Sequence, residues 1–181
     1  MPLLFSSLPN LITLARLGLV PVIIAMIAGG HWRGACVVFI LAGVSDAIDG
    51  WLARSFNLRT ELGAYLDPVA DKALLVSIYV ALTIENVLPA PLTIIIVTRD
   101  LMIIGAVMIS WLMHKPVEIK PLWVSKATTA AQIGFAASLL GARAFSFSLG
   151  MWVHIAVYIV AALTLASLAA YLAAWARHMS L

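Results

Sequence analysis

The chain has 181 residues, of which 64% are hydrophobic and 10% are charged, and its net charge is +3. This composition, with a mean hydropathy of +1.07, excludes an ordinary soluble domain and indicates a membrane protein. The few basic residues form no dense run of the kind that grips nucleic acid, so no nucleic-acid partner is expected. The single cysteine, Cys36, excludes an internal disulfide.

Six apolar segments follow one another along the chain, at about 9–29, 34–54, 64–84, 90–112, 123–141 and 150–174. Each has about the length that an α-helix needs to cross the hydrocarbon core of a bilayer. Polar or turn-forming residues separate them, at Gly29-Gly30, around Asn57, from Asn86, around His114 and from Gly141 to Gly150. The pattern predicts an all-α integral membrane protein with six transmembrane helices, in a single domain over residues 1–181.

The positive charges predict how these helices are oriented. One side of the predicted membrane carries six basic residues, namely Arg54, Arg59, Lys115, Lys120, Lys126 and Arg177. The opposite side carries only Arg33 and Arg143. Because basic loops stay in the cytoplasm, a multi-pass protein is expected with both termini and the loop between segments two and three on the cytoplasmic side. A bacterial inner membrane is the expected location.

Four aspartates, Asp46, Asp49, Asp67 and Asp71, lie close together in this apolar chain. Carboxylates near lipid are costly unless a cation or hydrogen bonds neutralise them. On a helix, Asp46 and Asp49 fall with Gly50 and Ala53 within a sector of roughly 100°. Gly63, Asp67 and Asp71 recur every four residues, so they also share one face. We expect the two faces to oppose each other and leave a notch for a ligand.

Opposed carboxylates without histidine or cysteine are hard oxygen ligands, which favour Mg²⁺ or Mn²⁺, or else Ca²⁺. Such ions in enzymes share their coordination with phosphate oxygens, so the pattern predicts phosphoryl-type chemistry with one carboxylate as base. Less specific explanations stay open. Asp67 before Pro68 could be a helix N-cap, Asp46 and Asp49 could pair with Arg54 and Arg59 at a solvated helix end, and an ion-coupled transporter could hold acidic residues in its spans.

The full spacing, Asp46-x2-Asp49-Gly50-x2-Ala53-Arg54-x8-Gly63-x3-Asp67-x3-Asp71, resembles the signature of the CDP-alcohol phosphatidyltransferase family at every fixed position. The opening from Leu8 to Arg16 and the stretch from Leu66 to Lys72 resemble its cardiolipin synthase and phosphatidylglycerophosphate synthase branches. The resemblance implies a six-helix, usually dimeric membrane enzyme. It would transfer a phosphatidyl group from CDP-diacylglycerol to an alcohol and release CMP.

The resemblance also implies roles for particular residues. Asp46, Asp49, Asp67 and Asp71 would hold a pair of divalent metal ions, and Asp71 would also take the proton from the acceptor hydroxyl. The CDP-lipid would lie against five further positions, Asn10, Gly50, Ala53, Arg54 and Gly63.

The acceptor is predicted from weaker signals. Arg99 lies near the middle of its span and must meet an anion there, either Asp100, a catalytic carboxylate or a substrate phosphate. With Lys120 and Lys126 it could form an acceptor site, although a structural ion pair is the alternative. The Arg99-Asp100 pair and the stretches around it resemble cardiolipin synthases more than phosphatidylglycerophosphate synthases, which favours phosphatidylglycerol over glycerol 3-phosphate as the acceptor.

Overall fold

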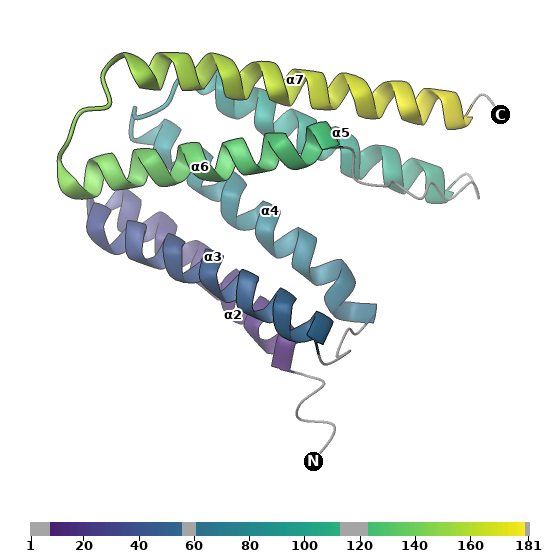
Figure 1. Cartoon of the computed structure of the whole chain (residues 1–181), viewed down its shortest axis with the longest axis horizontal. Coiled ribbons are helices and arrows are strands. Elements are labelled where there is room, and N and C mark those ends of the chain that lie inside the picture. Colours follow the sequence, from purple (N-terminus) through teal and green to yellow (C-terminus); the bar gives the residue numbers. More distant parts are fainter. Residues whose placement is uncertain (1–7, 56–60, 113–122, 180–181) are drawn as a thin grey trace. The chain divides into compact units, whose positions relative to one another are not determined.

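The computed structural model describes residues 8–55, 61–112 and 123–179, although not the side chains of 8–12, 49–55, 61–69, 107, 110, 111, 178 and 179. These ranges contain six helices and no strand (Figure 1). The helices are α2 (Leu8–Ala28), α3 (Trp32–Ser55), α4 (Glu61–Ile84), α5 (Ala90–Leu112), α6 (Trp123–Phe145) and α7 (Met151–Met179). The predicted all-α class is confirmed, with one helix for each apolar segment.

Among the described helices, α2, α4 and α6 end in the same way, with a residue in the left-handed conformation just after the last turn. At Gly30, φ is +71° and the next amide, of His31, donates to the carbonyl of Met26 at 2.8 Å. At Asn86, φ is +55° and the amide of Val87 donates to Leu82 at 2.8 Å. This Schellman arrangement satisfies carbonyls that a helix end otherwise leaves without partners. Glycine and asparagine are suited to it because they tolerate positive φ.

The end of α6 differs from the predicted break at Gly141. The helix continues through this glycine to Phe145. It stops only at Ser146, whose φ is +57°, where the amide of Phe147 donates to the carbonyl of Ala142 at 3.1 Å. A single glycine inside a helix costs only about 1 kcal/mol relative to alanine. Packing of the neighbouring turns, which bury Leu140 and Ala142, is enough to carry the helix past it.

The helices group into two compact units, which are described separately. The first contains α2, α3, α4 and the end of α6 from Ala136. The second contains α5, the part of α6 up to Phe135, and α7. Among the described residues, one stretch, Met151–Arg177 of α7, is long and apolar enough by itself to cross a membrane. The arrangement as six spans in a single domain stays a prediction.

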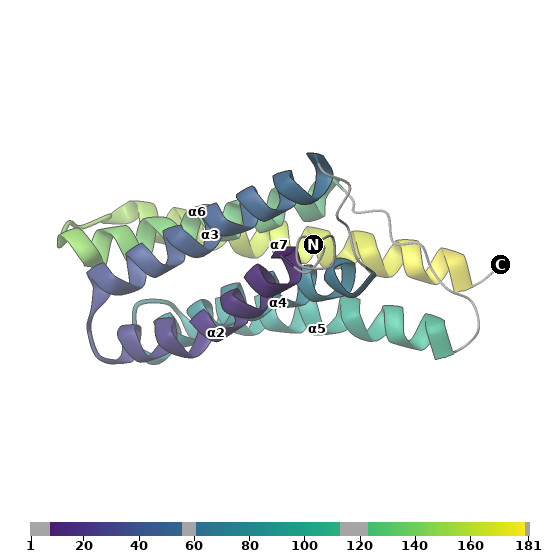
Figure 2. The same cartoon turned by 90° about the horizontal axis from the view of Figure 1, so that it is seen from below.

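In the first unit, α2 packs along both α3 and α4 (Figures 1 and 2). Ile23 and Ile27 of α2 are fully buried, as are Ala35 of α3 and Ala70 of α4. Small residues at helix contacts let backbones approach closely, which increases dispersion contacts where lipid weakens the hydrophobic driving force. This packing brings the polar residues of three helices to one place.

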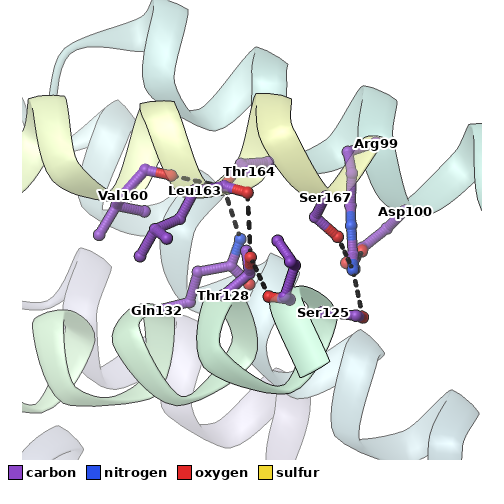
Figure 3. Close-up of polar contacts among 10 residues, drawn as sticks. Arg99, Asp100, Ser125, Thr128, Gln132, Val160, Leu163, Thr164 and Ser167 are labelled. Carbon is purple, nitrogen blue, oxygen red and sulfur yellow. Dashed lines mark hydrogen bonds and ion pairs between the residues drawn. The ribbon is translucent and has the colours of Figure 1, made fainter. Parts of the chain in front are cut away.

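In the second unit, buried polar side chains join α6 to α7 (Figure 3). The Gln132 amide donates to the Thr164 hydroxyl at 3.2 Å, and the Thr128 hydroxyl lies 3.0 Å from the carbonyl oxygen of Leu163. Both threonines and the glutamine are fully buried. Hydrogen bonds of this kind contribute about 0.6–2 kcal/mol each between apolar helices, and they fix which faces of α6 and α7 meet.

Candidate active site

Two of the four aspartates meet at one arginine. Arg16 of α2 places its Nη1 2.9 Å from Oδ1 of Asp46 on α3 and 2.6 Å from Oδ1 of Asp71 on α4. Asp71 accepts a hydrogen bond from this nitrogen. The predicted opposition of the two carboxylate faces is therefore observed for this pair, and α2 supplies the cation that holds it.

The burial of the three side chains is unequal. Arg16 is 2% exposed, whereas Asp46 and Asp71 are 45% and 46% exposed. A buried guanidinium is tolerated only when anions compensate its lost hydration. Here the two carboxylates supply that charge from one side, while nearly half of their own surface stays accessible. The junction thus presents its negative groups outward, where a ligand can reach them.

The remaining positions of the motif lie on the same two helices. Asp49, Gly50, Ala53 and Arg54 follow Asp46 within α3, and Gly63 and Asp67 precede Asp71 within α4. Both helices are continuous over these stretches, as the argument from helical faces requires. Their side chains, and that of Asn10 on α2, lie outside the described part of the chain, so their ligand roles stay predictions.

The helix boundaries exclude one of the less specific explanations and bear on another. Asp67 cannot be the N-cap of its helix, because α4 begins at Glu61. Asp46 does not lie at a helix end either, since α3 continues to Ser55. Its observed partner is Arg16, which belongs to another helix. The side chains of Asp49 and Arg54, and all of Arg59, lie outside the described part of the chain, so pairing among them is not tested.

The donor set at this junction fits a hard divalent cation. Asp46 and Asp71 bring carboxylates from two helices together at Arg16, and nearly half of each of these side chains stays exposed. Each carboxylate has two oxygens and several lone pairs, so contact with Arg16 and metal ligation are compatible. Among the described side chains, no group of three or more potential ligands is found. The full set of four therefore stays a prediction.

Arg16 is the residue that sequence reasoning missed. It lies at the end of the opening segment that resembles the family, and no partner is predicted for it from the sequence. The signal is present, because an arginine in an apolar helix must meet an anion. The same rule predicts an anion for Arg99, and four aspartates lie in the two segments after Arg16.

Arg99 lies in the second unit and is 2% exposed (Figure 3). Its Nη1 is 2.5 Å from Oδ1 of Asp100, and its Nη2 donates to the hydroxyls of Ser125 at 2.6 Å and Ser167 at 2.8 Å. Its guanidinium also lies 5.8 Å from the ring centroid of Tyr171. The observed anionic partner of Arg99 is thus Asp100, the first of the three predicted possibilities. The arginine thereby links α5, α6 and α7.

The other predicted acceptor residues are less well defined. Lys126 is exposed and places its ammonium 5.2 Å from the ring centroid of Trp123, one residue beyond the Ser125 that binds Arg99. Lys120 lies outside the described residues. An acceptor site formed by Arg99, Lys120 and Lys126 stays a prediction.

The described part of the chain is thus a set of helices in which two aspartates of the motif meet a buried arginine. The CDP-alcohol phosphatidyltransferase family matches residues 6–176. The chain therefore belongs to the CDP-alcohol phosphatidyltransferase family, as the resemblance implied.

Individual relatives fall in both of the expected branches. The chain is 35% identical to the human cardiolipin synthase (CMP-forming) over 91% of its own length and 60% of that protein. It is 31% identical to a chloroplastic CDP-diacylglycerol–glycerol-3-phosphate 3-phosphatidyltransferase of Oryza sativa subsp. japonica, over 92% of the chain and 56% of the relative. A probable phosphatidylglycerophosphate synthase of Mycobacterium tuberculosis is 41% identical over 53% of the chain and 49% of the relative. The chain thus spans about half to three-fifths of the length of these proteins.

Proposed function

We propose that this protein transfers a phosphatidyl group from CDP-diacylglycerol to the hydroxyl of an alcohol and releases CMP. The observation that carries the proposal is the junction of Asp46 and Asp71 at Arg16, inside a family motif that this chain matches at every fixed position. At this junction, two partly exposed carboxylates contact one buried guanidinium. Such an arrangement suits a reaction in which a phosphate ester must be held beside a base.

The chemistry needs one proton acceptor. The acceptor oxygen attacks the phosphorus of the phosphatidyl group, a new P–O bond forms, and the P–O bond to CMP breaks with its electron pair leaving on the CMP phosphate. The hydroxyl proton goes to the Asp71 carboxylate. Asp71 is suited to this role because it is nearly half exposed, so a hydroxyl can approach it. Its contact with Arg16 fixes its orientation.

The proposed cofactor is a pair of Mg²⁺ or Mn²⁺ ions held by Asp46, Asp49, Asp67 and Asp71. When bound, such ions stabilise the negative charge of a pyrophosphate and of the departing CMP. Asn10, Gly50, Ala53, Arg54 and Gly63 are proposed to receive the CDP-lipid. Residues without bulky side chains at three of these positions would let the nucleotide approach the helix backbones.

Arg16 acts in this proposal as a positioning residue. Four carboxylates at one site repel one another, and a fixed guanidinium reduces that repulsion where two of them converge. Because Arg16 is 2% exposed, its charge cannot move away when substrate enters. It therefore keeps Asp46 and Asp71 at a constant separation through the reaction.

The proposed acceptor is phosphatidylglycerol, and glycerol 3-phosphate is the second candidate. Similarity to the human cardiolipin synthase over 91% of the chain favours phosphatidylglycerol. Similarity to the rice enzyme over 92% of the chain supports glycerol 3-phosphate as the second candidate. The acceptor would lie near Arg99, Lys120 and Lys126. We further propose six membrane spans, both termini and the active site on the cytoplasmic side, and a homodimer.

An assay with the purified protein tests the function. CDP-diacylglycerol is offered with either phosphatidylglycerol or glycerol 3-phosphate, in the presence of Mg²⁺ or Mn²⁺, and CMP release is measured. We expect release with phosphatidylglycerol and its loss after EDTA treatment, with recovery when the metal is returned. A folded protein that releases CMP with neither acceptor would contradict both candidate reactions. Activity that survives EDTA would contradict the proposed cofactor.

A further inference from the structure

A hollow of about 840 Å³ lies in the first unit at the far end of α3 from the aspartates. It is formed where α2 ends, where α3 begins and where α6 ends. Along α3, the beginning at Trp32 and Asp46 are separated by about 20 Å at 1.5 Å per residue. The hollow is therefore separate from the proposed active site.

Two arginines line this hollow, and both are held by contacts within the unit. Arg33 of α3 donates from Nε to the carbonyl of Ala144 on α6 at 3.2 Å. Arg143 of α6 lies with its guanidinium carbon 5.5 Å from the ring centroid of Trp32. The two arginines thus line the same hollow from different helices. Both arginines are exposed, so their charges are accessible to a ligand.

Among the described residues, those that line the hollow carry positive charges and no negative charge. The imidazole of His31 lies in the same lining, and no aspartate or glutamate lines the hollow. Within the described ranges, neither Arg33 nor Arg143 is in an ion pair. The beginning of α3 lies at the same place, and the amides of a helix N-terminus add positive potential. Two guanidiniums at one site favour a phosphate, which they can bind through several charge-assisted hydrogen bonds.

Another part of the lining is apolar. Val22, Ala25 and Met26 of α2 form it, and Val22 is 41% exposed. A free inorganic anion would gain nothing from such a wall, whereas a phospholipid would place its glycerol and upper acyl chain there. The combination of a basic end and an apolar wall therefore favours an amphiphile with a negatively charged head group.

The distribution of charge along the chain supports the same conclusion. In the predicted topology, Arg33 and Arg143 are the two basic residues on the side that otherwise lacks them. Both of these exceptions line one hollow. Basic residues that were merely tolerated on this side would have no reason to converge from two helices far apart in the sequence.

We propose that this hollow binds the phosphate head group of an anionic phospholipid, in the membrane leaflet opposite to the proposed reaction. Arg33 and Arg143 bind the phosphate oxygens, and the α2 wall receives the adjoining apolar part. The lipid joins the end of α6 to the beginning of α3, so its binding stabilises the folded first unit by mass action. The choice of leaflet rests on the proposed topology, whereas the binding itself does not depend on the proposed reaction.

Binding can be tested with the full-length protein in a neutral detergent, by following its thermal unfolding during titration with short-chain phosphatidic acid. Short-chain phosphatidylcholine and inorganic phosphate serve as parallel titrants. We expect a saturable rise in Tm with phosphatidic acid and much smaller shifts with the other two. Arg143→Gln and Arg33→Gln should each weaken the apparent affinity by about tenfold, the usual range for one charge-assisted contact.

Arg177→Gln is a matched control. Arg177 is also exposed and also donates from Nε to a helix carbonyl, that of Ala173 at 3.2 Å, but it does not line the hollow. It should bind phosphatidic acid as the wild type does. If one of the two pocket variants fails to fold, the other suffices, because the arginines come from different helices. Unchanged affinity in a folded pocket variant overturns the proposal. An equal shift with phosphatidylcholine, or with inorganic phosphate, overturns the assignment to an anionic lipid.

Discussion

At the scale of single residues, Arg16 changes how the aspartate motif is understood. Considered alone, four carboxylates in an apolar chain pose an electrostatic problem that only a bound cation seems to solve. The structure shows that the protein carries one cation of its own at two of them. The protein itself thus removes part of the repulsion between these carboxylates.

Replacing Arg16 should therefore affect both stability and activity. Arg16→Gln leaves the facing carboxylates without their cation, and we expect a loss of about 1–3 kcal/mol in the free energy of unfolding, the usual cost of removing a hydrogen bond to a charged group. Chemical denaturation in detergent measures this loss. Asp71→Asn in the Arg16→Gln background should add less than it does in the wild type, because the two residues interact. Strictly additive effects would contradict the observed contact.

Asp71 is the proposed proton acceptor, so its replacement should act on turnover. Asp71→Asn keeps the size of the side chain but removes a base, and we expect kcat to fall by about 10²–10⁴ while CDP-diacylglycerol binding is largely retained. Single-turnover kinetics and a binding titration measure the two effects separately.

Glu85→Gln provides the control for Asp71→Asn. It makes the same chemical change just beyond the other end of α4 and should leave kcat unchanged. If Asp71→Asn abolishes binding together with turnover, Asp71 acts mainly as a metal ligand and the proposed base lies elsewhere.

At the scale of secondary-structure elements, buried polar contacts decide which helix faces meet. In the second unit, α5, α6 and α7 converge on Arg99 through Asp100, Ser125 and Ser167 (Figure 3). Hydropathy cannot select these faces, because the surrounding side chains are almost uniformly apolar. A guanidinium with several donors is able to do so, since each donor requires an acceptor in a particular direction.

The position of Arg99 predicts a large effect on stability. Arg99→Gln leaves the buried Asp100, which is 6% exposed, without its cation, and breaking a buried pair in this way costs about 3–5 kcal/mol. Adding Asp100→Asn should recover most of this loss, because the negative charge that Arg99 compensates is then removed. Thermal unfolding of the single and double variants measures both steps.

The same variants test whether Arg99 also contributes to the acceptor site. If it does, the stable double variant should show a higher KM for the acceptor and an unchanged KM for CDP-diacylglycerol. Equal effects on both KM values, or none, would leave Arg99 with a structural role only.

At the scale of the whole molecule, the proposed topology makes an accessible prediction. Cys36 is the single cysteine and is buried, so a Cys36→Ala background can carry new cysteines at chosen positions. Ser148 is exposed between α6 and α7, on the side that the charge distribution places outside. Ser148→Cys should react with a membrane-impermeant maleimide added to intact cells, whereas Ser180→Cys should react only after the membrane is permeabilised. The reverse labelling pattern would contradict the proposed orientation.

The sequence by itself determined the helices, the membrane class and the family. Segment length and hydropathy are local properties, so the six helices were predicted to within a few residues, and the aspartate spacing is a local property of two of them. The end of α6 was misplaced because tertiary packing carried the helix through Gly141, against a weak local preference.

Only the tertiary structure decided the partners. Arg16 is separated from Asp46 and Asp71 along the chain, and Arg33 is far from Arg143, so their contacts depend on how the helices pack. Periodicity specifies the face on which a charge lies, but not which other helix brings the opposite charge or a second arginine to it. These long-range choices created both the arginine-held aspartate junction and the basic hollow at the other end of α3.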